Sequence, residues 1–292
     1  MYWIVTDSAI DMPQEWIGAQ EKLRVVPLAY VLDDVTHVPD GTEESTRAFY
    51  DQLRAGKLPT TTQVTPAVWE EHLRPILEGG EDVLLIAFSS GLSGTCQAAR
   101  LAADDLREEY PERTIHVVDS LCASAGQGLL LHYVLQNRAD GMSLAENARW
   151  AEENVQNVIH WFTVNDLMHL SRGGRVSKTS AIIGTLAHIK PVMHVDENGK
   201  LAVYGKVPGR KRAISALAEH ICQDIVEPEG QLILISHGDC ADEAGMLADR
   251  LRAALPACEV RLTYVGSVIG AHTGPGVIAV FCMGKTRQPK GK

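Results

Sequence analysis

Residues 83–95 read VLLIAFSSGLSGT. The first six are apolar, which is the length of a buried strand, and apolar residues recur at helical spacing from Cys96 to Glu109. The glycines and hydroxyls therefore lie where a strand of a parallel sheet passes into its helix. In such sheets ligands bind at the carboxyl ends of the strands, where free helix N–H groups favour an anion.

The rest of the first half repeats this alternation of short apolar runs and helical segments. Further runs are Trp3 to Val5, Val25 to Val31 and Ile115 to Val118. Helix starts are marked by Thr65-Pro66 and by Ser120, since hydroxyl caps and a first-turn proline are typical of helix N-termini. This order predicts βαβ units and a parallel sheet.

The pattern changes after a helical stretch from Ser143 to Val155. A strand from Ile159 to Val164 comes next, and a hairpin is predicted around Glu197-Asn198-Gly199. The fold class predicted is α/β with two domains, an N-terminal parallel-sheet α/β/α domain (1–155) and a C-terminal mixed α+β domain (156–285). A short free tail (286–292) ends the chain.

Composition limits the possible functions. At 292 residues the chain is long enough for two cores. A net charge of −10 without a basic stripe argues against nucleic acid as a partner. No basic leader precedes Asp7 and the apolar runs are too short to span a bilayer, so we expect a cytoplasmic protein. The six cysteines include no C-x-x-C pair, which favours reduced thiols and no metal site.

The string Ser89 to Thr95 is the first candidate site. Gly91 and Gly94 let a ligand approach the backbone, and the hydroxyls of Ser93 and Thr95 can donate to an anion. A helix cap is the alternative role of this string. A serine hydrolase is a further alternative, although its G-x-S-x-G elbow would need glycine where Thr95 stands.

Three more segments carry polar groups that could bind a ligand. The loop from Pro59 to Pro66 is rich in hydroxyls, and the glycine-proline turn from Gly270 to Gly276 presents His272 outward. The turn from Leu170 to Ser177 holds Arg172 and Arg175, whose guanidinium groups suit carboxylates and phosphates. A polar turn, a solvated histidine and ordinary surface arginines are the alternatives.

The order of these strings along the chain resembles the DegV family. The family pattern matches Thr6-Asp7-Ser8, Asp40-Gly41, Thr61-Thr62-Gln63, Ser89 to Thr95, Val118-Asp119-Ser120, Leu170 to Ser177 and Ala271 to Gly276. The resemblance implies a two-domain protein that holds a long-chain fatty acid in an apolar tunnel, with the carboxylate near the domain junction. It also implies a lipid carrier without catalysis or cofactor of its own, similar to the lipid-presenting subunit of fatty acid kinase, whose separate catalytic subunit phosphorylates the carboxylate.

Carried over by matching strings, the resemblance implies the following site. Thr61 and Ser93 would hydrogen-bond the carboxylate, His272 would lie beside it, and Gly94 would offer its N–H. Thr62 and Thr273 would complete the ligand-binding set. Arg172 and Arg175 would contact the partner kinase or the edge of the ligand mouth.

The chain departs from the family pattern in two places. Pro208 stands where the family often has an arginine linked to phosphotransfer or partner contact, with Lys206 and Arg210 as neighbouring substitutes. Thr62 and Val64 stand where serine and proline are common, which affects the shape of the loop. Two other functions remain open: an esterase or phosphate-ester enzyme using Ser93 and His272, and a regulator that docks to a partner with the lipid as filler.

Overall fold

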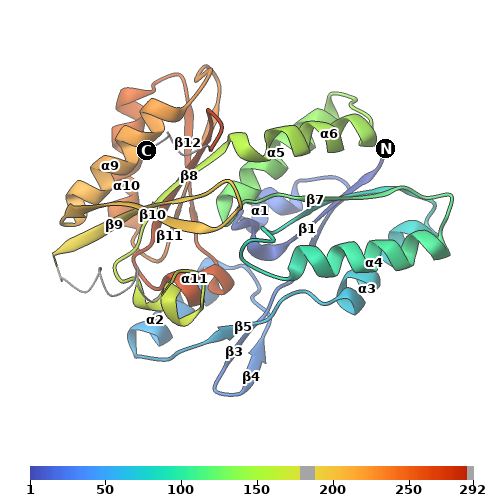
Figure 1. Cartoon of the computed structure of the whole chain (residues 1–292), viewed down its shortest axis with the longest axis horizontal. Helices are drawn as coiled ribbons and strands as arrows, with labels where there is room; N and C mark the ends of the chain where they lie inside the picture. The colour runs from blue at the N-terminus through green and yellow to red at the C-terminus, as the bar shows by residue number, and fades with distance from the viewer. Residues whose placement is uncertain (178–187, 288–292) are drawn as a thin grey trace.

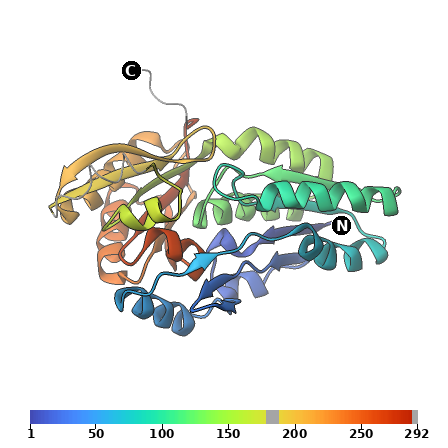
Figure 2. The ribbon, with the colours of Figure 1, turned by 60° about the horizontal axis from the view of Figure 1, so that its bottom comes forward.

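A computed structural model describes residues 1–177 and 188–287 of the chain. Two large β-sheets lie side by side, each with its own covering helices, as Figures 1 and 2 show. A small third sheet lies below them in Figure 1. The predicted α/β fold class, with one parallel and one mixed sheet, is confirmed.

The first sheet is parallel and has the strand order β2-β1-β6-β7. Its strands are β1 (Trp3–Asp7), β2 (Leu23–Val26), β6 (Val83–Ala87) and β7 (Ile115–Asp119). Its helices are α3 (Pro66–Glu78) and α4 (Thr95–Glu109) on one face, and α5 (Ala125–Ala139) and α6 (Leu144–Asn154) on the other. β6 is buried at every position, as its unbroken apolar run predicts.

The second sheet is mixed and has the order β10-β9-β8-β13-β11-β12, with only the β11–β12 pair parallel. Its strands are β8 (Val158–Thr163), β9 (Ile189–Val195), β10 (Leu201–Pro208), β11 (Leu232–His237), β12 (Glu259–Tyr264) and β13 (Ile278–Met283). Helices α9 (Arg210–Asp224) and α10 (Ala241–Ala254) cover one face, and α5 packs against the strands as well.

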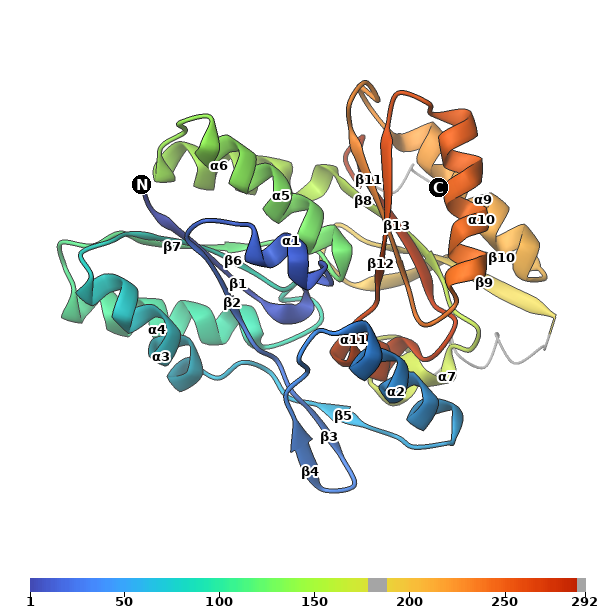
Figure 3. The same ribbon diagram turned by 180° about the vertical axis from the view of Figure 1, so that it is seen from behind.

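The remaining described elements lie outside the two large sheets. They are η1 (Ser8–Ile10), α1 (Gln14–Gly18), β3 (Tyr30–Leu32), β4 (Val35–His37), α2 (Glu43–Arg54), β5 (Thr60–Thr61), η2 (Val155–Asn157), α7 (Met168–Arg172) and α11 (Ser267–Thr273). The strands β4-β3-β5 form the third sheet. α2 packs against α11, so an early segment lies on the second half of the chain, as Figure 3 shows.

The core is continuous between the two large sheets. One cluster of buried side chains joins Ile4 and Leu84 of the parallel sheet to Phe281 of the mixed sheet through Leu129 and its neighbours on α5. Separate clusters lie beneath α3 and α4 and beneath α9 and α10. The predicted boundary near residue 156 stays a prediction, because helices of the first half pack on both sheets.

Two local predictions were wrong, and one helix was not predicted. The run from Val25 to Val31 forms two strands, β2 and β3, because Pro27 cannot donate to a ladder. Ser120 does not cap a helix; its hydroxyl accepts from the Cys122 N–H, and α5 begins at Ala125. The helix α2 was not predicted, although the Thr42 hydroxyl caps it by accepting from the Ser45 N–H.

The predicted tail begins too early. Arg287 is buried, and its guanidinium donates to the carbonyl oxygens of Leu121 and Val155. Its N–H donates to the Gln156 carbonyl, so the chain is still packed at this point. The other tail residues from 288 onward lie outside the described residues. Within the described ranges, no helix has the length and hydropathy of a membrane span.

Candidate functional site

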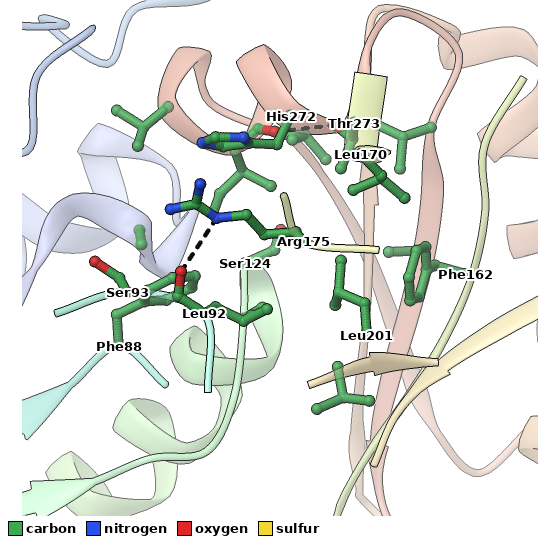
Figure 4. A pocket seen from close by; sticks show the side chains of 18 of the residues that line it. Phe88, Leu92, Ser93, Ser124, Phe162, Leu170, Arg175, Leu201, His272 and Thr273 are labelled. Carbon is green, nitrogen blue, oxygen red and sulfur yellow. Dashed lines mark hydrogen bonds between the residues drawn. The ribbon is translucent and has the colours of Figure 1, made fainter. Parts of the chain in front are cut away.

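A narrow apolar cavity lies between the two large sheets. Its volume is about 80 Å³, several times what one water molecule needs on the same measure. Most of its wall is apolar, and the polar side chains gather in part of it, as Figure 4 shows. The apolar lining includes Leu28, Phe88, Leu92, Phe162, Leu170, Val195, Leu201, Val265, Val268, Ile269, Val277 and Phe281.

Thr61 and His272 meet at the polar end of the cavity. The distance between Thr61 Oγ1 and His272 Nε2 is 2.8 Å. Thr61 ends β5, whereas His272 lies in the last turn of α11. The prediction of an outward histidine on a glycine turn was wrong: the turn starts only at Gly274 (φ +73°), and the imidazole points into the protein.

Ser93 lines the same cavity from the connection between β6 and α4. Its Oγ lies 2.9 Å from Thr95 Oγ1 and accepts from the Thr95 N–H at 3.3 Å. Gly94 is the N-cap residue of α4 and lies outside the cavity lining, and a Cβ there would lie 2.1 Å from Gln63 Oε1. Of the partners that the described residues give Ser93, none is a histidine or carboxylate.

Arg175 lines the cavity itself, whereas the prediction placed it at the partner kinase or the edge of the ligand mouth. Its Nε donates to the Leu92 carbonyl at 3.2 Å and its Nη1 to the Gly173 carbonyl. Figure 4 shows its guanidinium between the His272 ring and Ser93. The guanidinium is half-buried, which lowers its pKa, and no carboxylate in the described part of the chain pairs with it. A partly buried cation without a counterion favours an anionic ligand.

The remaining predicted residues divide between the cavity and the surface. Thr62 and Thr273 line the cavity, and the Thr273 hydroxyl donates to the Ile269 carbonyl. Arg172 is exposed, and its Nη2 lies 3.2 Å from His169 Nδ1. It borders a groove of about 270 Å³ that shares Thr61, Arg175 and His272 with the cavity, so the polar end lies beside a surface opening.

Burial and the positive charge of Arg175 lower the pKa of His272 to about 4. The imidazole is therefore neutral at pH 7 and can both donate and accept a hydrogen bond. Gly173 explains part of this packing, because a Cβ there would lie 2.2 Å from His272 Nδ1. Gly173, at the end of α7, thus lets this helix lie against the His272 ring.

Two residues of the cavity wall were not predicted from the sequence. Ser124 precedes α5, and His160 lies on β8 with Nε2 accepting from the Ala123 N–H at 3.2 Å. Their neighbours in the cavity are far apart in sequence, so only the packing of the two sheets brings them there. The positive φ of Ser124 (54°) likewise cannot be recognised from a serine in a sequence.

Two cations near Pro208, Lys206 and Arg210, could take the place of the arginine of the family pattern. Their surroundings differ. Arg210 is committed to the protein interior, since its side chain pairs with Glu243 at 3.0 Å and donates to the Gly276 carbonyl. Lys206 is exposed on β10, two residues from Pro208 and on the same face of the strand.

The comparisons with known proteins agree with this architecture. The family model described as "Uncharacterised protein, DegV family" matches residues 2–285. The chain belongs to the DegV family. A DegV domain-containing protein of Clostridium perfringens is 39% identical over 287 residues, which is 98% of each chain.

Solved DegV structures share the whole fold. A fatty acid binding DegV family protein from Streptococcus agalactiae is 31% identical with a TM-score of 0.84, covering 98% of this chain and 99% of the other. A DegV family protein from Thermus thermophilus, described as binding fatty acid, is 29% identical with a TM-score of 0.85, covering 97% and 99%.

Proposed function

We propose that this DegV protein binds one long-chain fatty acid, with the acyl chain in the apolar cavity and the carboxylate at Arg175, Thr61, Ser93 and His272. The observation that carries the proposal is the half-buried Arg175, which has no carboxylate partner among the described residues at the polar end of an apolar cavity. The fatty acid binding reported for the proteins of S. agalactiae and T. thermophilus supports it.

The acyl chain and the carboxylate of the fatty acid should contribute differently to the binding free energy. Each buried CH₂ contributes about 0.8 kcal/mol, so a chain of some fourteen methylenes gains on the order of 10 kcal/mol. A hydrogen bond to a charged group adds only about 1.5–3 kcal/mol. The apolar wall therefore supplies most of the affinity, and the polar residues orient the carboxylate toward the groove.

Two arginine variants test the carboxylate site. Arg175→Gln should weaken binding of a saturated fatty acid about ten- to a hundredfold, because the carboxylate loses its cation. Arg172→Gln, a matched control three residues away on the surface, should leave the affinity unchanged. Titration of delipidated protein, with native mass spectrometry of the co-purified ligand, gives both values. Equal affinities for wild type and Arg175→Gln would refute this placement of the carboxylate.

We also propose that the bound carboxylate is presented to the catalytic subunit of a fatty acid kinase. The groove beside Thr61, Arg175 and His272 supports this step, because it offers a route from solvent to the carboxylate. Arg172 borders the groove and Lys206 is the exposed cation nearest Pro208 along β10, so these two would contact the kinase.

Acyl-phosphate formation tests the presentation step. Loaded protein, a bacterial fatty acid kinase and ATP should yield acyl phosphate, and Arg172→Gln should lower the rate while the protein keeps its lipid. In a separate assay, hydrolysis of a p-nitrophenyl ester by the protein measures any hydrolase activity. If wild-type protein binds fatty acid and no kinase phosphorylates it, the carrier proposal stands without this partner.

A further inference from the structure

Thr95 contacts the Ser93 hydroxyl from the protein interior. Thr95 is fully buried and lies outside the cavity lining, whereas Ser93 is partly exposed and lines the cavity. Thr95 Oγ1 lies 2.9 Å from Ser93 Oγ and accepts from the Val64 N–H at 3.3 Å. A chain of hydrogen bonds therefore runs from the loop between β5 and α3, through Thr95, to the cavity.

The direction of the bond between the two hydroxyls follows from the burial of Thr95. If Ser93 donated to Thr95, the Thr95 oxygen would accept twice, and its own proton would have no other acceptor among the described residues. Burying a donor without an acceptor is costly. If Thr95 donates to Ser93, the remaining proton belongs to Ser93, which lines the cavity and can donate to a ligand or to water. The second direction satisfies both hydroxyls.

Ser93 can then offer a ligand only a proton. Its Oγ accepts from the Thr95 hydroxyl and, at 3.3 Å, from the Thr95 N–H, so both of its lone pairs are used. The neighbouring Arg175 guanidinium, which Figure 4 shows between Ser93 and the His272 ring, also only donates. An ionised carboxylate only accepts and matches these two groups, whereas a protonated acid carries an O–H that neither of them can accept.

We propose that Thr95 is a positioning residue that holds the Ser93 hydroxyl as a hydrogen-bond donor, so that the site prefers the ionised carboxylate of a fatty acid to the protonated acid. Thr95 acts through Ser93 and does not touch the ligand. Hydrogen bonds in a chain also strengthen one another, so the Val64 N–H and the Thr95 hydroxyl make Ser93 a better donor. This inference rests on the proposed fatty acid binding and names the ionisation state that the site selects.

The pKa of the bound carboxyl group tests this role. It is measured by NMR over a pH series, with delipidated protein reloaded with palmitic acid that carries ¹³C at its carboxyl carbon. In Thr95→Val the Ser93 oxygen regains a lone pair and can accept from the protonated acid. The pKa of the bound acid should therefore rise by about half a unit to one unit, a three- to tenfold loss of preference for the carboxylate.

Two further substitutions at the same position support the comparison. Thr95→Ser keeps the hydroxyl and should restore the wild-type pKa of the bound acid. Thr95→Cys replaces the hydroxyl with a much weaker donor and serves if Thr95→Val does not fold.

Ser93→Ala separates positioning from a structural effect. Thr95→Val also removes the acceptor of the Val64 N–H, in the loop that follows Thr61. If Thr95 acts through Ser93, adding Thr95→Val to Ser93→Ala should leave the pKa of the bound acid where Ser93→Ala alone puts it. An effect transmitted by the loop would persist in the double variant.

Thr46→Val is the matched control. It removes another buried threonine hydroxyl, which donates to the Thr42 carbonyl outside the cavity lining, and should keep the wild-type pKa of the bound acid. An unchanged pKa in Thr95→Val, or a rise that persists beside Ser93→Ala, would overturn the role of Thr95. If palmitic acid does not bind the wild-type protein, the proposed function fails instead.

Discussion

At the scale of single residues, burial and the neighbouring Arg175 together keep His272 neutral. Burial and this guanidinium hold the pKa of His272 at about 4. Arg175→Gln removes the repelling cation and should raise this pKa toward its ordinary value, although burial still opposes it. Histidine NMR titration of ligand-free protein measures the change. Arg172→Gln, which removes a surface cation, should leave the His272 titration in place, and an equal shift in both variants would contradict the assignment.

For the proposed carboxylate site, the residue types could be predicted from the sequence better than their surroundings. Thr61, Ser93 and His272 were expected together, and the structure places all three on one cavity. The inward position of Arg175 was missed, because glycine-flanked arginines are typical of surfaces. Ser124 was missed because its role depends on Asp11 and Ser236, each more than a hundred residues away.

At the scale of helices, two glycines differ in their surroundings. A Cβ on Gly126 in the first turn of α5 would lie 2.2 Å from Nε2 of the buried His160, whereas a Cβ on Gly245 in α10 meets nothing within 4 Å. Gly126→Ala should therefore destabilise the protein by about 1–3 kcal/mol through overpacking. Gly245→Ala should stabilise it by up to about 1 kcal/mol, the helix preference of alanine.

Denaturant unfolding of the two alanine variants measures both changes in the free energy of unfolding. The opposite signs make the comparison informative, because helix propensity alone would stabilise both variants. Stabilisation of Gly126→Ala would show that the His160 ring can move away.

Helix and strand starts were predicted where the signal is local. Thr65 caps α3 ahead of Pro66, and the hairpin β9–β10 turns at Asn198-Gly199 as expected. The start of α5 was misplaced because the Ser120 hydroxyl accepts from the Cys122 N–H. Ser124, which does precede α5, bonds to Asp11 instead of capping the helix. Local rules fail here since a tertiary contact competes for the capping hydroxyl.

At the scale of the whole molecule, the alternation of apolar runs and helices was enough to predict two α/β halves. It could not show how they join, because contacts between distant segments leave no periodic pattern. Asp11 is one such junction. Its Oδ1 accepts from the Gly266 N–H ahead of α11, its Oδ2 from Ser124 ahead of α5, and its carbonyl from the Thr263 hydroxyl of β12.

The protonation of Asp11 should make the stability of the whole fold depend on pH. Burial, with a smaller effect of Asp7, raises the pKa of Asp11 from 3.8 to about 7. Between these values the folded protein keeps a proton that the unfolded chain loses. Stability therefore falls as pH rises from about 4 to 7, by on the order of 3–4 kcal/mol for this group.

Asp11→Asn should reduce this dependence to the part due to Asp7, whose pKa burial also raises, because the amide cannot ionise yet can still accept from Gly266 and donate to Ser124. Unfolding in denaturant at a series of pH values gives the slope for each protein. Asp105→Asn makes the same charge change on the exposed face of α4 and should keep the slope of the wild type. Parallel curves for wild type and Asp11→Asn would mean that Asp11 is ionised in the folded protein throughout this range, and that its three contacts join the halves as a charged group.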